Sequence, residues 1–178
     1  MPRLFTALEL PEDIAADLAM LRGGLPGARW IDVENYHITL RFIGDTGEAE
    51  AREIHALLER IQRKPLTVTL EGLTAFGGGK PRAIVAAVKP ETPLLEFQAG
   101  QERLMRRLGL PAETRKFSPH VTLARLRQTS ALAVADYISA RGFLPSRSFE
   151  AKQFVLMSAR DSLGGGPYVI EAAYPLEA

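Results

Sequence analysis

The sequence contains no cysteine and only three histidines among its 178 residues. Without cysteine, disulfides, thiolate metal sites and cysteine nucleophiles are excluded, and we expect a cytoplasmic protein because disulfides mark oxidising compartments. The sequence also has no run of about 18 apolar residues, which is the length that a membrane-spanning helix needs. We therefore expect no membrane partner.

A strong overall charge is also missing, since the formal net charge is +1. The overall charge therefore gives no indication of nucleic-acid binding, which a strongly positive molecule would give. Basic residues are nevertheless concentrated between positions 101 and 127, where only Glu102 and Glu113 oppose them: Arg103, Arg106, Arg107, Arg115, Lys116, Arg125 and Arg127. This stretch has the charge that an anionic ligand requires.

A repeated tetrapeptide is the most informative feature that is present. His37-Ile38-Thr39-Leu40 and His120-Val121-Thr122-Leu123 each lie in a short apolar run that predicts a buried strand. Side chains at positions i and i+2 of a strand point to the same face, about 7 Å apart, so each motif presents an imidazole beside a hydroxyl. The intervening aliphatic side chains then face the core.

The wider pattern predicts an α+β fold. Short apolar or alternating runs predict strands over residues 3–10, 36–43, 66–73, 82–89, 149–158 and 168–174. Helical periodicity predicts helices over 12–22, 48–63, 93–108 and 130–141. The two halves follow a similar plan and no Pro-, Gly- or Ser-rich linker separates them. We therefore expect one bilobal domain over residues 1–178, with two similar lobes of antiparallel sheet facing each other across a cleft and helices packed outside.

Two histidines and two threonines in such a cleft suit reaction at a phosphodiester. Displacement at phosphorus needs a base for the entering oxygen and an acid for the leaving oxygen, and imidazole can serve as either near neutral pH. The hydroxyls of Thr39 and Thr122 can donate to the non-bridging oxygens, where transition-state charge develops. We therefore expect catalysis by His37, Thr39, His120 and Thr122, without a metal or cofactor.

Four stretches of this sequence, residues 3–11, 36–44, 81–85 and 117–125, resemble the 2H phosphoesterase superfamily, and within it the bacterial RNA 2′,3′-cyclic phosphodiesterases, also called 2′-5′ RNA ligases. The resemblance implies the same two-lobed fold. It also implies hydrolysis of RNA or oligonucleotide ends that carry a 2′,3′-cyclic phosphate, leaving a 2′-phosphate, with ligation as a side activity. His37 would be the general acid and His120 the general base.

The resemblance further implies that Phe42 stacks on a nucleobase and that Arg125 binds phosphate. Each lies five residues after its motif histidine, and strict alternation places that position on the wrong face of the strand. Either a bulge or the end of the strand turns these side chains toward the cleft, or they are ordinary core and surface residues. Arg41 and Arg82 are weaker candidates as phosphate neighbours.

Two other functions remain open from the sequence. One is hydrolysis of a small cyclic nucleotide, such as an ADP-ribose cyclic phosphate, and the other is non-catalytic binding of RNA ends. His55 lies beside the apolar stripe of its predicted helix without a threonine partner, so no chemistry is expected of it. The glycines at 77–79 are followed by Pro81 and a strand, which favours a hairpin connection over a phosphate loop. We expect the chain to act as a monomer.

Overall fold

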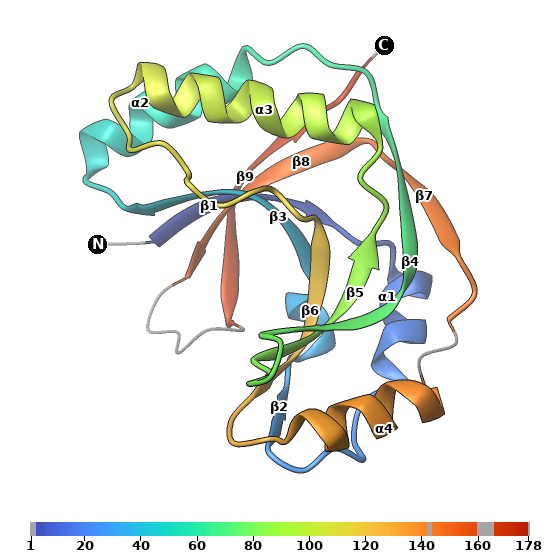
Figure 1. Ribbon diagram of the computed structural model, residues 1–178. Coiled ribbons are helices and arrows are strands. Elements are labelled where there is room, and N and C mark those ends of the chain that lie inside the picture. The colour runs from blue at the N-terminus through green and yellow to red at the C-terminus, as the bar shows by residue number, and fades with distance from the viewer. Residues whose placement is uncertain (1–2, 142–143, 160–165, 178) are drawn as a thin grey trace.

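The computed structural model describes residues 3–141, 144–159 and 166–177, in which strands and helices follow one another as drawn in Figure 1. The strands are β1 (Arg3–Glu9), β2 (Ala28–Trp30), β3 (His37–Asp45), β4 (Leu66–Phe76), β5 (Ala83–Val88), β6 (His120–Leu126), β7 (Arg147–Ala151), β8 (Gln153–Ala159) and β9 (Tyr168–Pro175). The helices are α1 (Glu12–Ala19), α2 (Glu48–Glu59), α3 (Thr92–Arg107) and α4 (Ala131–Arg141), with a short 3-10 helix η1 (Val33–Asn35).

The strands form one antiparallel sheet in the order β7-β4-β5-β6-β3-β1-β8-β9, and β2 pairs with β6. The two motif strands, β3 and β6, meet only through the pair Ile38 and Val121. This narrow junction divides the sheet into a first lobe of β1, β3, β8 and β9 and a second lobe of β2, β4, β5, β6 and β7. The predicted α+β class with antiparallel strands in two lobes is confirmed, and the lobes touch where the two motifs begin.

Each lobe contains strands from both halves of the sequence. β4 follows the first motif in the sequence but pairs with β5 and β7 in the second lobe. β8 and β9 follow the second motif but join β1 in the first lobe. Since the chain crosses between the lobes in both directions, the duplicated plan of the sequence does not correspond to two separate pieces of chain.

The single strand predicted over residues 149–158 is wrong. β7 ends at Ala151 and lies beside β4, whereas β8 begins at Gln153 and lies beside β1 in the other lobe. Lys152 and Gln153 are both exposed, so the alternation of buried and exposed side chains breaks between the two strands. The chain crosses from one lobe to the other at this break.

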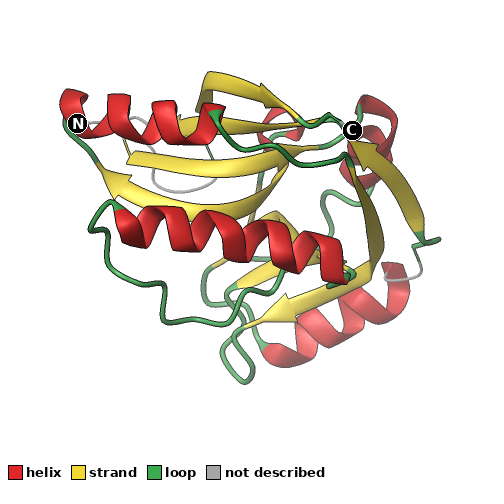
Figure 2. Cartoon of the chain, turned by 90° about the horizontal axis from the view of Figure 1, so that it is seen from above, coloured by secondary structure: helices red, strands yellow, loops and turns green. Residues whose placement is uncertain are grey.

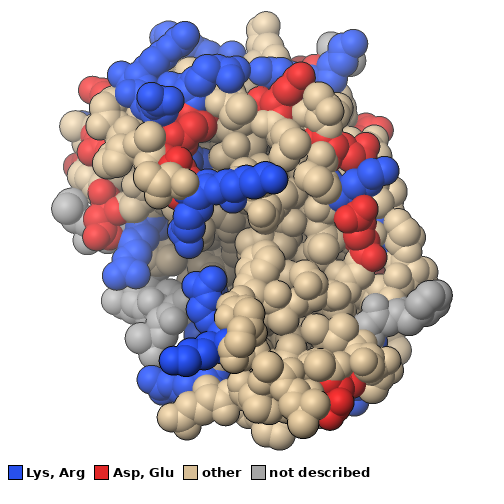
Figure 3. Space-filling model, in the orientation of Figure 1, with Lys and Arg blue, Asp and Glu red and all other residues tan. Residues whose placement is uncertain are grey.

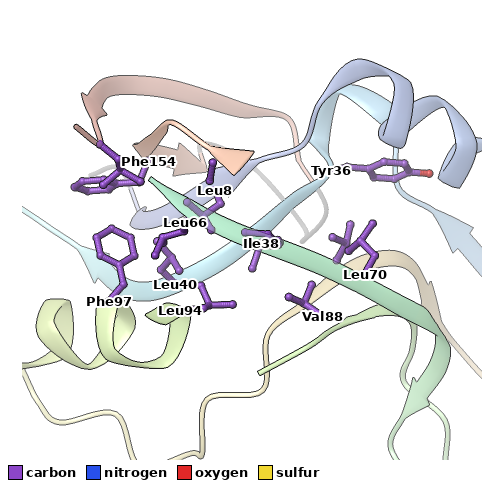
Figure 4. Packing of buried hydrophobic residues seen from close by; sticks show 14 of the residues in the cluster. Leu8, Tyr36, Ile38, Leu40, Leu66, Leu70, Val88, Leu94, Phe97 and Phe154 are labelled. Carbon is purple, nitrogen blue, oxygen red and sulfur yellow. The ribbon is translucent and has the colours of Figure 1, made fainter. Parts of the chain in front are cut away.

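One core serves both lobes. Its largest cluster combines Leu8, Ile38 and Leu40 of the first lobe with Leu70 and Val88 of the second, as Figure 4 shows. The expectation that Ile38, Leu40, Val121 and Leu123 face the core is confirmed, because each is at most 3% exposed. Burial of aliphatic side chains at this junction, at about 1.5–3 kcal/mol each, stabilises the position of one motif strand against the other.

The helices lie along the outside of the strands, as the view in Figure 2 shows. Helix α2 buries Ile54 and Leu58, and α3 buries Leu94, Phe97 and Met105, at the i, i+3 and i+4 spacings of an amphipathic helix. α2 is shorter than predicted, because Arg60 and Ile61 donate to carbonyls only three residues back and the chain then has no regular secondary structure as far as Pro65. No helix in the described residues is long and apolar enough to cross a membrane.

Candidate active site

Both motif strands carry a bulge at the same position. In β3 the register against β1 shifts directly after Thr39, which makes Leu40 the extra residue. In β6 the register against β5 shifts directly after Thr122, which makes Leu123 the extra residue. An extra residue moves the alternation of side chains by one position. The residues that follow each bulge therefore point to the opposite face from the one that strict alternation predicts.

The bulges decide the orientation of Phe42 and Arg125. Of the alternatives that the sequence left open, the structure has the bulge, and both side chains line the same cleft as the motif histidines. Phe42 is 53% exposed, an unusual fraction for a large apolar side chain, so its ring is available to a ligand. Arg125 is exposed as well.

The cleft lies where the two lobes meet and has a volume of about 440 Å³. All four motif side chains line it: His37 and Thr39 from β3, and His120 and Thr122 from β6. They reach the same place because they flank the paired residues Ile38 and Val121, whose own side chains point into the core on the other face. The sequence predicted this convergence.

Backbone carbonyls hold both imidazole rings. Nδ1 of His37 lies 2.8 Å from the carbonyl oxygen of Asn35, and Nδ1 of His120 lies 2.7 Å from that of Ser118. A carbonyl only accepts, so in each ring Nδ1 carries a proton and Nε2 is the nitrogen available for proton transfer. In His37, Nε2 lies 2.8 Å from Thr39 Oγ1 and accepts from that hydroxyl when the ring is neutral.

The cleft disfavours the charged form of both rings. Burial lowers the pKa of His37 from 6.5 to about 4, against the opposing effect of the hydrogen bond to Asn35, and the charges of His120 and Arg125 lower it further. Burial is also the main cause that lowers the pKa of His120, and Arg125 adds to it. In the free protein both rings are therefore mainly neutral at pH 7, and an anion between them would favour protonation.

Aromatic side chains surround the two motif histidines. The sequence did not predict that any of them would lie there. The rings of Phe5 and Tyr168 each lie 5.0 Å from the His37 ring, and Phe76 meets the His120 ring edge-on at 4.7 Å. Phe5 lies in β1, which is buried on both faces, so the strand by itself does not indicate that this ring reaches His37. Tyr168 comes from β9, and no local pattern indicates that it reaches His37. These rings exclude water from the imidazoles and so account for part of their lowered pKa values.

Basic side chains border the cleft. Arg82, Arg115, Lys116 and Arg125 line it together with one carboxylate, Glu113. Figure 3 shows Lys and Arg on both sides of a hollow on the face drawn there. Such a concentration of positive charge attracts a phosphate-bearing ligand.

Arg41, one of the two weaker candidates as a phosphate neighbour, lines the cleft, but its guanidinium is also bound within the protein. Its guanidinium donates to Glu102 and to the backbone carbonyls of Phe42 and Pro111, so one N–H of each of its three nitrogens is engaged within the protein. Arg82 is exposed in the cleft and remains a candidate neighbour of phosphate.

The third histidine has a structural place away from the cleft. His55 Nδ1 lies 2.8 Å from the Tyr174 hydroxyl and Nε2 lies 2.8 Å from Glu59, which connects α2 with β9. Gly77 and Gly78 have positive φ angles in the hairpin between β4 and β5, in agreement with the predicted connection. The described residues contain no group of three His, Asp or Glu side chains arranged to hold a metal ion.

Comparison with known proteins identifies the family. A family model described as LigT-like phosphoesterase matches residues 8–85 and 87–168. The RNA 2′,3′-cyclic phosphodiesterase of Archaeoglobus fulgidus is 28% identical over 163 residues, which cover 86% of this chain and 92% of the relative. The corresponding protein of Geobacillus stearothermophilus is 30% identical over 97% of this chain but only 56% of its own length.

A solved structure supports the fold. The crystal structure of E. coli LigT complexed with 3′-AMP superposes with a TM-score of 0.80 at 23% identity, covering 99% of both chains. The family model matches most of the sequence, including both motif strands. The chain therefore belongs to the LigT-like phosphoesterase family.

Proposed function

We propose that this protein hydrolyses terminal 2′,3′-cyclic phosphates of RNA or oligonucleotides to 2′-phosphates, and that it does so as one bilobal unit over residues 1–178. The observation that carries the proposal is the convergence of His37, Thr39, His120 and Thr122 with Arg125 in one cleft. The names of the relatives in A. fulgidus and G. stearothermophilus support this choice of substrate. We further propose that the protein acts as a monomer in the cytoplasm, because one chain supplies both histidines, both threonines and the arginine of the cleft and the sequence contains no cysteine.

The proposed reaction is a displacement at phosphorus with two proton transfers. A water molecule attacks the cyclic phosphate, the P–O3′ bond breaks, and the 2′-phosphate remains. One imidazole takes the proton of the water, and the other gives a proton to O3′. We assign His120 as the base and His37 as the acid, each through Nε2, because Nδ1 of each ring donates to a carbonyl.

The remaining side chains have binding roles in this proposal. The hydroxyls of Thr39 and Thr122 and the guanidinium of Arg125 stabilise the charge on the non-bridging oxygens. Phe42 stacks on the base of the terminal nucleotide, for which its exposed ring is suited. If the 5′-hydroxyl of a second RNA strand replaced water, the same proton transfers would join the ends as a 2′-5′ linkage.

The test is an assay in EDTA with an oligonucleotide that ends in a 2′,3′-cyclic phosphate, followed by identification of the product ends. We expect a 2′-phosphate product and no need for added metal. Turnover of an ADP-ribose cyclic phosphate in place of the oligonucleotide would assign the cleft to small cyclic nucleotides. Tight binding of the RNA end without turnover would make the protein a binding module and would contradict the proposed hydrolysis.

A further inference from the structure

Arg41 has a buried charge in the strand that carries the first motif. The residue is 6% exposed and lies two positions after Thr39. Its Nε donates to Glu102 on α3, its Nη1 to the carbonyl of Phe42, and its Nη2 to the carbonyl of Pro111 at 2.6 Å. One guanidinium therefore connects β3 with a helix and with the segment that follows this helix.

The second oxygen of Glu102 extends these contacts into the bridging loop, which we define as residues 109–119 between α3 and β6. Glu102 accepts the backbone N–H of Glu113 at 3.0 Å, and the Glu113 carboxylate accepts the N–H of Arg115 at 3.0 Å. Figure 1 shows this loop, in yellow, crossing the sheet in front of β1 and β3 before it enters β6. A continuous path of hydrogen bonds thus runs from the first motif strand to the loop that leads into the second motif.

The bridging loop supplies several groups to the cleft. Arg115, Lys116 and Ser118 line the cleft, and the Ser118 carbonyl accepts from His120 Nδ1 at 2.7 Å. The loop therefore holds two basic groups at the edge of the cleft and also the acceptor that determines which nitrogen of His120 carries the proton.

We propose that Arg41 is a positioning residue that, through Glu102 and Pro111, fixes the bridging loop so that Arg115, Lys116 and the Ser118 carbonyl are held in place at the cleft. A buried ion pair is often no more stabilising than apolar residues of the same size, so stability alone does not explain this one. Precise placement does, because a shift of about 1 Å near a reacting group can cost about 10²-fold in rate. The expected effect on turnover rests on the proposed function, whereas the contacts of Arg41 do not depend on it.

The first experiment compares three purified variants by backbone hydrogen exchange and by kcat/KM on the cyclic-phosphate oligonucleotide. Arg41→Lys keeps the charge but loses the planar set of donors, and Glu102→Gln loses the charge while keeping the size of the side chain. Arg147→Lys is the matched control, since Arg147 pairs with Asp13 and Asp17 outside the cleft lining.

We expect exchange in residues 110–118 to rise about tenfold or more in Arg41→Lys and Glu102→Gln, and kcat/KM to fall about 10- to 100-fold, with the control unchanged within about twofold. If exchange instead rose evenly over the whole chain, Arg41 would be a general structural residue and the proposal would be wrong. The proposal would also be wrong if Arg41→Lys and Glu102→Gln both behaved like the control.

A double-mutant cycle tests the connection to the cleft. Arg115→Ala should lower kcat/KM in the wild type, and this loss should be at least about threefold smaller when Arg41→Lys is already present, because the loop no longer holds Arg115 in place. Equal losses in the two backgrounds would contradict the proposal. If the wild type itself had no turnover, the proposed function would fail, while hydrogen exchange of the loop with and without inorganic phosphate would still decide the role of Arg41.

Discussion

The pH dependence of turnover should differ between the free protein and its complex with substrate. In the free protein, burial lowers the pKa of His37 to about 4 and that of His120 below its usual 6.5. Acid–base catalysis requires one neutral and one protonated ring, so kcat/KM should be highest between the two pKa values, on the acid side of pH 6.5. Above the upper pKa it should fall about tenfold per pH unit.

The magnitude follows from the value for His37. At pH 7, which is about three units above its pKa, roughly one His37 ring in a thousand is protonated, a cost of about 4 kcal/mol. A cyclic phosphate monoanion between the rings favours their charged forms and raises both pKa values. The alkaline limb of kcat, which reports the complex, should therefore lie at higher pH than that of kcat/KM.

The same values bear on the roles of the two rings. The family resemblance makes His37 the general acid, yet His37 is the ring whose pKa lies far below neutral pH in the free protein. The two statements agree only if the bound phosphate restores the proton to His37. Residual rates of the variants assign the roles: His120→Ala should lose the acidic limb, and His37→Ala should lose the alkaline limb.

The measurement combines initial rates from about pH 3 to pH 9 in EDTA with an NMR titration of the imidazole carbon-bound protons over the same range, so that it extends below the lower pKa of about 4. The protein has only three histidines, so single replacements assign every signal. A His37 ring that titrated at or above pH 6.5 in the free protein would refute the effect of burial. If the alkaline limbs of kcat and kcat/KM coincided, the expected rise of the histidine pKa values on phosphate binding would be wrong. If His120→Ala lost the alkaline limb and His37→Ala the acidic limb, the acid and base roles would be exchanged.

The remaining predictions concern single side chains. His37→Ala and His120→Ala should each lower kcat about 10²–10⁴-fold, whereas His55→Ala should leave kcat unchanged. A loss in His55→Ala equal to that of the other two variants would contradict the assignment of the active site. Arg125→Ala should lower kcat about 10²–10³-fold. It should also shift both limbs of the pH profile to higher pH, because the charge of Arg125 lowers the pKa of both histidines. A loss that vanished with added salt would show that Arg125 only attracts the substrate from a distance. Phe42→Ala should raise KM with little change in kcat, as measured with oligonucleotide substrates. The rise in KM should correspond to the loss of a stacking free energy of about 1–3 kcal/mol.

The sequence by itself determined which residues meet the core and which meet the cleft at the two motifs. Ile38 and Val121 are apolar neighbours of polar residues on a strand, and a period of two leaves only one way to bury them. Once they are buried, His37 and His120 must point the other way. Helix α3 was predictable from its helical periodicity and β5 from its continuous apolar run, which are both local signals.

Tertiary pairing decided the rest of the site. A bulge appears only when a strand is paired, so the extra residues Leu40 and Leu123, and with them the orientation of Phe42 and Arg125, could not be read from either strand alone. The separation of β7 from β8 likewise depends on which lobe offers each strand a partner.

Tyr168 beside His37 and the contacts of Arg41 with Glu102 join residues that are more than 60 positions apart. Local periodicity carries no information over such distances, because it reports only how one element divides its faces between core and solvent. The sequence thus determined the four motif side chains, and the packing of the two lobes determined what surrounds them.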